Sequence, residues 1–183
     1  MSAVFTGMRE GELFGLQWTD IDWFNNQIHV KRTYNHRRFY EPKSKASRRS
    51  IDLAPKLVKE LRQWRLACPK NELDLVFPSE AGTPEDAANF LKRRFFRALT
   101  KAKLPKIRFH DLRHTYAALV WEQIKDVKYL QSQLGHSSVT MTMDVYGHLM
   151  NKTNQDAATK LGDVIFGDDG SETVADSKKE VTP

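Results

Sequence analysis

Apolar residues recur at helical spacing along most of this chain, and the pattern predicts a mainly helical protein. Gly135 and Gly147 each follow one of these patterns and are typical of helix ends. In the helix before Gly147, we expect Met141 and Val145 to form the apolar side. The predicted helices cover residues 2–17, 55–68, 127–134, 139–146 and 152–166, together with two that begin at Pro84 and at Asp111.

A β-rich stretch follows the first predicted helix. Asn25 and Asn26 indicate a turn between strands at residues 21–24 and 27–34. A third strand, at residues 48–53, follows a loop. The fold class that we predict is therefore α+β, mainly helical, with a small antiparallel three-stranded sheet near the N-terminus.

The composition favours one globular domain with a basic body. The chain has 183 residues, 40% of them hydrophobic, and a formal net charge of +6. A polar tail at residues 168–183 holds five acids and two lysines, so the rest of the chain carries +9. Such a body favours a polyanionic partner such as nucleic acid. Cys68 is the single cysteine, which excludes an internal disulfide, and no apolar run could cross a membrane, so we expect a cytoplasmic protein.

Positive charge is concentrated in two places. Residues 31–49 contain eight Lys or Arg residues and one acid, Glu41. A sheet edge with this charge is either solvated or laid against phosphates. The helix that begins at Pro84 places Leu91 and Leu99 toward the core and its arginines outward, which a solvated face and a DNA contact explain equally well. The predicted contacts with the DNA backbone are Lys31, Arg32, Arg37, Arg38, Arg48, Arg49, Arg93 and Arg94.

Candidate chemistry lies in the second half of the chain. Asp111 is predicted to cap a helix, with His110 and Arg113 three residues apart at its N-terminal edge. A helix N-terminus attracts anions, an imidazole can move a proton, and a guanidinium can hold two oxygens. This pairing suits phosphate chemistry, although an incidental His and Arg on a solvated face fit equally well. Arg9 and Glu12 are also three residues apart, and a surface ion pair is their simplest interpretation.

Five short blocks of sequence, in this order along the chain, resemble the motifs of one protein family. They are TGMREGEL at residues 6–13, PKSKASRR at 42–49, HDLRHT at 110–115, LGHSS at 134–138 and MTMDVYGH at 141–148. The family is that of the tyrosine recombinases, the phage-type integrases, and the chain resembles their catalytic domain over roughly residues 4–150.

The resemblance implies a site-specific DNA recombinase or integrase that cleaves and rejoins DNA through a 3′-phosphotyrosyl intermediate. Arg9 and Arg113 would clamp the non-bridging oxygens of the scissile phosphate, and Tyr146 would attack phosphorus. His110 would act as general base, and His136 would donate a hydrogen bond to the phosphate.

Three further expectations follow from the resemblance. Glu12 would support the site without contacting the reacting atoms. A hairpin lysine would protonate the leaving 5′-oxygen; Lys43, which follows a proline, is preferred over Lys45, although loop length varies in the family. No metal, nucleotide or other cofactor is implied.

The resemblance also implies properties of the whole molecule. The catalytic domain is expected at residues 1–166, N-terminally truncated and without the family's core-binding domain, before an acidic, disordered tail at residues 167–183. Its partner is double-stranded DNA, on which we expect a homotetramer, with a monomer free in the cytoplasm of a bacterial or phage-infected cell. A truncated DNA-binding remnant without strand exchange is one alternative. A zinc hydrolase with His110, His114 and His136 as ligands is another.

Overall fold

The computed structural model describes residues 1–42, 44–147 and 164, and residues 1–150 form one compact unit. The predicted helix at residues 152–166 and the tail lie outside the described residues, apart from residue 164. The helices are α1 (Ser2–Thr6), α2 (Glu10–Phe14), α3 (Pro55–Ala67), α4 (Ala87–Phe90), α5 (Phe96–Lys101), α6 (Asp111–Ile124), α7 (Val127–Leu134) and α8 (Val139–Tyr146). Shorter helical pieces are η1 (Trp18–Asp20), η2 (Lys45–Ser47) and the π-helical η3 (Leu91–Phe95). The strands are β1 (Ile21–Asp22), β2 (Gln27–His29), β3 (Thr33–Asn35), β4 (Arg38–Tyr40) and β5 (Ser50–Asp52).

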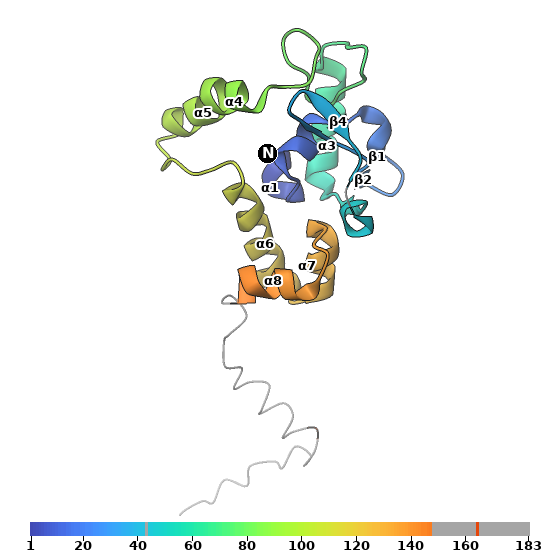
Figure 1. Cartoon of the computed structure of the whole chain (residues 1–183), viewed down its shortest axis with the longest axis vertical. Coiled ribbons are helices and arrows are strands. Elements are labelled where there is room, and N and C mark those ends of the chain that lie inside the picture. The colour runs from blue at the N-terminus through green and yellow to red at the C-terminus, as the bar shows by residue number, and fades with distance from the viewer. Residues whose placement is uncertain (43, 148–163, 165–183) are drawn as a thin grey trace, which may run out of the picture. The chain divides into compact units, whose positions relative to one another are not determined.

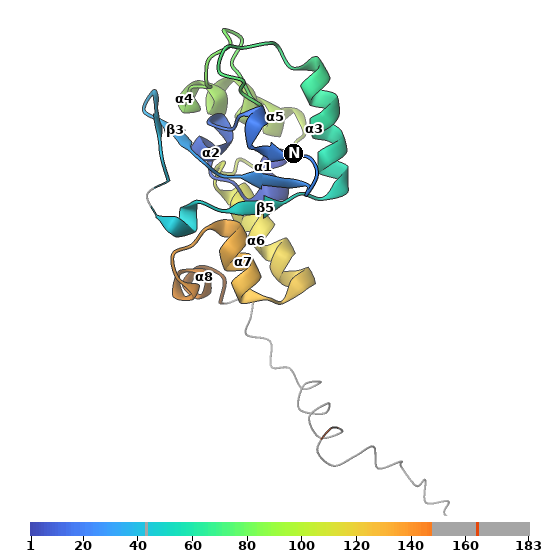
Figure 2. The ribbon, with the colours of Figure 1, turned by 90° about the vertical axis from the view of Figure 1, so that its right-hand side faces the viewer.

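The unit contains two apolar clusters. The first holds residues of the three-stranded sheet and of α3, such as Ile28, Ile51 and Leu57. The second joins α6, α7 and α8, which lie together at one end of the unit in both views (Figures 1 and 2). Contacts of α1 with α6 and of β5 with α7 connect the two clusters. Across the residues that the structure describes, none of the helices is long and apolar enough to span a bilayer.

The predicted three-stranded antiparallel sheet is confirmed, in the order β1-β2-β5, with Ile28 of β2 opposite Ile51 of β5. The predicted strand at residues 27–34 is wrong in extent, because the chain leaves this sheet after β2 and forms a separate hairpin, β3-β4. The two residues at its turn, His36 and Arg37, have φ angles of 46° and 60°. Glycine or asparagine usually marks such a turn, and their absence from these two positions hid it from the sequence.

The predicted helix at residues 2–17 is wrong in the same way, because it is two helices. The backbone turns left-handed at Gly7, where φ is 60°, and Arg9 then precedes α2 in an extended conformation. An added Cβ at Gly7 would lie 2.4 Å from Cδ1 of Tyr116 on α6. The break therefore lets α6 lie directly against this backbone, and it brings Arg9 to the start of α2.

Gly7→Ala is expected to destabilise the fold more than Gly82→Ala does. Both glycines have a positive φ, 60° and 75°, so each alanine costs about 1–2 kcal/mol of backbone strain. Only at Gly7 does the new Cβ collide with a buried ring, because at Gly82 its nearest neighbour is Cβ of Asn71 at 3.5 Å. Overpacking adds about 1–3 kcal/mol at Gly7. Urea unfolding measures both variants, and equal losses would show that Tyr116 does not press on this backbone.

The helix predicted from Pro84 begins later, at Ala87. Asp86 caps it, its carboxylate accepting a hydrogen bond from the N–H of Asn89 at 2.9 Å. Its inward side is less buried than the apolar spacing suggests, because Leu99 is buried whereas Leu91 is only half-buried.

Asp111 does not cap α6, which corrects a second local prediction. His110 occupies the cap position, without a capping hydrogen bond from its side chain. The Asp111 carboxylate instead accepts hydrogen bonds from the backbone N–H and the guanidinium of Arg108, both at 2.8 Å. The carboxylate therefore lies on the surface, and the first N–H groups of α6, those of Asp111, Leu112 and Arg113, donate to the carbonyl oxygens of the turn that precedes the helix.

The extents of α7 and α8 are confirmed, but the predicted apolar side of α8 is wrong. Met141 is 43% exposed and Val145 is 40% exposed, whereas Thr142 and Tyr146 are buried. The buried pair lies one residue further along the chain, so α8 turns the hydroxyl-bearing side chains of Thr142 and Tyr146 inward.

Candidate active site

Arg9 and Glu12 form an ion pair that is buried at one end. The Arg9 backbone N–H and its Nη1 donate to the two oxygens of Glu12, at 2.8 and 2.9 Å. The Glu12 side chain is 5% exposed while that of Arg9 is 40% exposed. The simple surface ion pair is therefore wrong for Glu12, and Arg9 keeps part of its guanidinium toward solvent, where an anion could bind.

Arg49 holds Glu12 from the other side, in a place that the sequence did not predict. Its Nη1 and Nη2 donate to both Glu12 oxygens at 2.9 Å, and its Nε donates to the carbonyl oxygen of Gln133 at 2.6 Å. Burial alone would raise the pKa of Glu12, but the hydrogen bonds and charge of Arg49, together with Arg9, lower it to about 2. The Arg49 side chain is only 5% exposed. We predicted that it contacts DNA at the surface, but it is a buried partner of Glu12.

Arg113 is buried and fixed by the backbone. Its Nη1 donates to the carbonyl oxygen of Gly7 at 2.6 Å, and its Nη2 donates to that of Leu134. Burial, and then repulsion by Arg9 and Arg49, lower the pKa of Arg113 to about 9. The guanidinium therefore stays charged near neutral pH in a region where other cations already stand, which is an arrangement that an anion stabilises.

Arg49 and Arg113 together bind the last carbonyl groups of α7, which lack partners within the helix. The chain then turns at Gly135, where φ is 65°. A Cβ at Gly135 would lie 2.8 Å from Cδ of Arg49. Only glycine thus fits between Arg49, the carbonyl oxygen of Ala46 and the turn, and this fixes the position of His136, the next residue.

His136 is buried and contacts two residues of α8. Its Nδ1 is 2.9 Å from Oγ1 of Thr142, and its ring stacks on that of Tyr146, with centroids 6.4 Å apart and an interplanar angle of 5°. Burial and the charge of Arg113 lower the pKa of His136 to about 4. The imidazole is therefore neutral near pH 7, and its second nitrogen remains available to a ligand.

Tyr146 is the C-terminal residue of α8 and only 3% exposed. Its hydroxyl oxygen is 3.0 Å from Nδ1 of His114, one helical turn beyond His110 on α6. The rings of the two histidines lie with centroids 5.0 Å apart. Burial raises the pKa of Tyr146 while Arg113 opposes the rise, and burial followed by His114 lowers the pKa of His110. The hydroxyl group therefore lies among imidazole rings and near the fixed cation of Arg113.

The structure thus brings together Arg9, Glu12, His110, Arg113, His136 and Tyr146 from segments distant in sequence. Sequence reasoning gave two members of this cluster other roles: Arg49 was predicted to contact the DNA backbone, and His114 was considered as a ligand of zinc. The spacing of His114 from His110 was the available signal for the second. Lys43 lies outside the described residues, as does the side chain of Lys45.

The other predicted DNA contacts differ in whether their side chains already form ion pairs within the protein. Lys31 and Arg32 both pair with the buried Asp20, so neither side chain is unengaged. Arg48 pairs with Glu41 on the surface, and Arg94 pairs with Glu80 and Glu85. The remaining three, Arg37, Arg38 and Arg93, are exposed.

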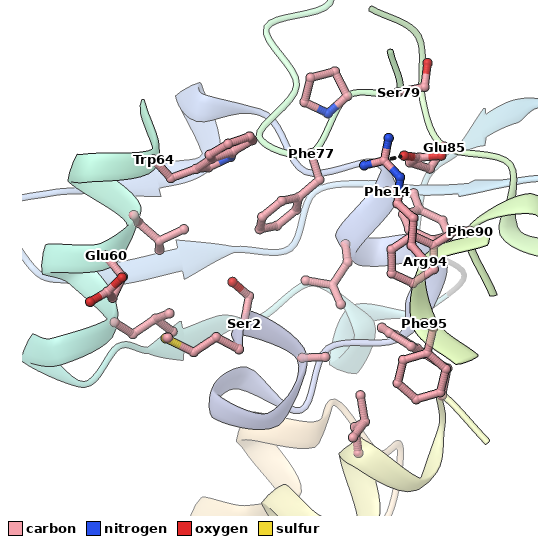
Figure 3. A pocket seen from close by; sticks show the side chains of 18 of the residues that line it. Ser2, Phe14, Glu60, Trp64, Phe77, Ser79, Glu85, Phe90, Arg94 and Phe95 are labelled. Carbon is pink, nitrogen blue, oxygen red and sulfur yellow. Dashed lines mark ion pairs between the residues drawn. The ribbon is translucent and has the colours of Figure 1, made fainter. Parts of the chain in front are cut away.

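An apolar cavity of about 550 Å³ lies apart from this cluster (Figure 3). It is lined by residues such as Leu61, Trp64, Phe77 and Phe90, and by the Glu85–Arg94 ion pair. None of the clustered residues named above lines it. The candidate chemistry is therefore in the charged, largely buried cluster and not in the apolar cavity.

The zinc alternative finds no set of ligands in the structure. Within residues 1–42, 44–147 and 164, no group of three or more His, Cys, Asp or Glu side chains is placed to hold a metal ion. His136 and His114 instead bond to the hydroxyls of Thr142 and Tyr146.

Relatives of known identity match almost the whole described unit. The sequence model of the phage integrase family matches residues 1–153. The chain is 32% identical to a XerC-like tyrosine recombinase of Caldanaerobacter subterraneus, over 88% of this chain and 47% of that protein. It is 35% identical to the ICEBs1 integrase of Bacillus subtilis, over 89% of this chain and 47% of that protein. The chain therefore spans about half the length of these curated relatives.

The fold matches solved recombinase structures. An integrase of the transposon Tn1549, in complex with a circular intermediate DNA, has a TM-score of 0.73 at 25% identity, over 88% of this chain and 56% of that one. The crystal structure of XerA recombinase has a TM-score of 0.62 at 28% identity, over 88% of this chain and 54% of that one. The predicted fold class is thereby confirmed.

Proposed function

Because the chain belongs to the phage integrase family, we propose that it carries out the cleavage and rejoining steps of a site-specific DNA recombinase. The observation that carries the proposal is the position of Tyr146, whose hydroxyl lies in one cluster with Arg113 and the two histidines, His114 and His136. A phenol, fixed cations and imidazoles are the groups that a phosphoryl transfer through a tyrosyl ester requires.

In the proposed reaction, Arg9 and Arg113 bind the non-bridging oxygens of the scissile phosphate. Negative charge increases on these oxygens in the pentacoordinate transition state, so donors fixed before the reaction stabilise it most. The backbone carbonyls that hold Arg113 supply this rigidity, and Glu12 supplies it for Arg9. His136 donates a hydrogen bond from the nitrogen that Thr142 leaves available.

Tyr146 attacks phosphorus, and the bond from phosphorus to the 5′-oxygen breaks. The leaving oxygen takes a proton from a hairpin lysine, Lys43 or Lys45, as the family resemblance implies. The phosphotyrosyl ester conserves the energy of the broken bond, so a 5′-hydroxyl of another strand can reverse the attack. The scheme uses no metal, nucleotide or other cofactor.

The proposed substrate is double-stranded DNA, and support comes from the Tn1549 integrase structure, which contains a circular intermediate DNA. The net charge of +6 and the exposed Arg37, Arg38, Arg48 and Arg93 support contacts with its backbone. We place the reaction in the cytoplasm of a bacterial host, since the relatives come from bacteria and phages. A tetramer on DNA, from monomers in solution, is the assembly that we propose.

Incubation with a nicked duplex carrying a candidate attachment site tests this function. The nick lets the short 5′-hydroxyl fragment diffuse away, so a covalent protein–DNA adduct accumulates. We expect an adduct on a denaturing gel, peptide mapping that assigns it to Tyr146, and no effect of a chelator. Adducts at another residue, or adducts that a chelator abolishes, would contradict the mechanism.

A DNA-binding remnant without strand exchange is the second candidate. It is favoured by the small exposure of Tyr146, which is 3% exposed. This reading expects duplex binding that weakens steeply with salt, together with no adduct on any of a panel of nicked sites.

A further inference from the structure

We propose that His114 is the group that accepts the proton of Tyr146 when the phenol attacks phosphorus. The inference rests on the proposed function and assigns a catalytic role to a residue for which neither the motifs nor the family resemblance supplied one. It also replaces His110, the base that the sequence predicted.

The geometry puts His114 in direct contact with the reacting oxygen. Its Nδ1 lies 3.0 Å from Oη of Tyr146, within the heavy-atom distance over which a general base takes a proton. The two rings are 5.7 Å apart between centroids and inclined at 61°. For Nδ1 to accept, the neutral imidazole of His114 carries its proton on Nε2.

The partners of this contact are fixed by the surrounding fold. His114 is on α6, and Arg113, the residue before it, donates to two backbone carbonyl oxygens. Tyr146 is on α8, which Thr142 ties to His136. Separate hydrogen bonds therefore position the two partners, so the fold fixes the distance between Nδ1 of His114 and Oη of Tyr146.

The charges around His114 permit it to take up a proton. On α6 it faces His110 and the carboxylate of Asp111, and on α8 it faces Tyr146. The pKa of His110 is lowered, by burial first and by neighbouring cations next, so His110 remains neutral beside a protonated His114. The pKa of Asp111 is also lowered, chiefly by its hydrogen bonds to Arg108, so its carboxylate remains charged and stabilises the imidazolium.

The step balances with the groups already named. The bond from Oη of Tyr146 to phosphorus forms while the bond from phosphorus to the 5′-oxygen breaks. The phenol proton moves to Nδ1 of His114, and the hairpin lysine protonates the 5′-oxygen. In the reverse reaction His114 returns the proton to the tyrosine. His110 is then free to contact the phosphate beside Arg113.

His114→Asn tests the proposal, because the amide oxygen of asparagine can accept the phenol's hydrogen bond near the position of Nδ1 but cannot take its proton. We expect the single-turnover rate of adduct formation to fall by roughly 10²–10⁴-fold. The rate that remains should rise with pH to beyond ~10, the ordinary pKa of a phenol, because burial raises the pKa of Tyr146. His36→Asn, at an exposed turn where φ is 46°, is the matched control and should keep the wild-type rate.

A second substrate distinguishes removal of the proton from Tyr146 from protonation of the leaving 5′-oxygen. In a duplex with sulfur replacing the bridging 5′-oxygen, the thiolate leaves without being protonated. The His114→Asn variant should remain slow on this duplex, since its defect lies in the attack. Recovery of the wild-type rate would place His114 on the leaving group and overturn the proposal. A rate within about threefold of wild type on the ordinary duplex, or a faster one, would also overturn it.

Two further controls keep the result interpretable. If His114→Asn unfolds, as circular dichroism would show, His114→Ala with added imidazole replaces it, and the expected result is a rate restored by imidazole. Imidazole without effect on a folded variant would count against the proposal. If the wild-type chain forms no adduct, or forms it elsewhere than on Tyr146, the proposed function itself fails. A wild-type adduct on Tyr146 makes the His114 variants decisive for the inference alone.

Discussion

Replacing Tyr146 with phenylalanine is expected to abolish the covalent protein–DNA adduct while the fold is kept. The phenyl ring can keep its place in the second apolar cluster and its stacking on His136. The variant loses only the hydroxyl and its hydrogen bond to His114, a loss of about 1 kcal/mol. Adduct yield on a denaturing gel and the midpoint of urea unfolding measure the two effects separately.

Tyr129→Phe is the matched control for this variant. It also removes a tyrosine hydroxyl that has an internal partner, Oδ2 of Asp52 at 3.0 Å. Because Tyr129 lies on α7 and outside the cluster, we expect an undiminished adduct. An adduct from Tyr146→Phe would show that another residue is the nucleophile, and loss in both variants would attribute the effect to the fold.

Arg49→Met is expected to cause the largest loss of stability among the variants considered. Methionine fills similar space, but it leaves the buried Glu12 carboxylate with Arg9 alone and removes the donor to Gln133. Breaking a buried ion pair from one side costs roughly 3–5 kcal/mol. Urea unfolding at neutral pH gives the free energy difference directly.

The difference in free energy of unfolding between wild type and Arg49→Met should depend on pH in a definite direction. The folded-state pKa of Glu12 is about 2, below its ordinary value of 4.5. A lowered carboxyl pKa contributes stability that is present above the ordinary value and is lost as the pH falls through the folded one. The gap between wild type and Arg49→Met should therefore be full above pH 4.5 and should narrow toward pH 2.

Arg48→Met provides the control from the neighbouring position. Arg48 is 62% exposed and pairs with Glu41, which is 81% exposed. Exposed ion pairs contribute little, so we expect almost no change in unfolding. Equal losses from Arg48→Met and Arg49→Met would mean that the buried pair does not stabilise this fold.

The contrast between Arg48 and Arg49 also shows where sequence reasoning stops. The two arginines lie between η2 and β5, and the sequence does not say which of the two side chains faces inward. That choice depends on Glu12, 37 residues away, and on Gln133, 84 residues away. The sequence therefore predicted a basic surface, and the tertiary structure divided it into one exposed and one buried arginine.

Local patterns predicted what local interactions determine. The extents of α7 and α8 follow from apolar spacing and from Gly135 and Ser138, whose hydroxyl caps α8. The buried side of α8 did not follow, because hydrophobicity favours Met141 over Thr142. Thr142 is buried since His136 provides a partner for its hydroxyl, and that partner is known only from the fold.

The cluster's residues were predicted as a set through their motifs, but the contacts among them were not. Motifs supplied Arg9, His110, Arg113, His136 and Tyr146, each within a block of sequence. The hydrogen bond between Tyr146 and His114 joins α8 to α6, and the two residues are 32 positions apart in the sequence. Such a pairing depends on how the helices cross, which spacing within either helix does not fix.

The distances along the chain that these contacts span also decide when the site comes into existence. Arg113 reaches Gly7 across 106 positions, and Arg49 reaches Gln133 across 84. Closing such long loops costs chain entropy before the contacts form, so they belong to the late stages of folding. During synthesis on the ribosome, Tyr146 emerges after both arginines and their carbonyl partners. Under the proposed function, a half-made polypeptide is therefore unable to cut DNA, and the activity begins only once the last helix of the unit has been added.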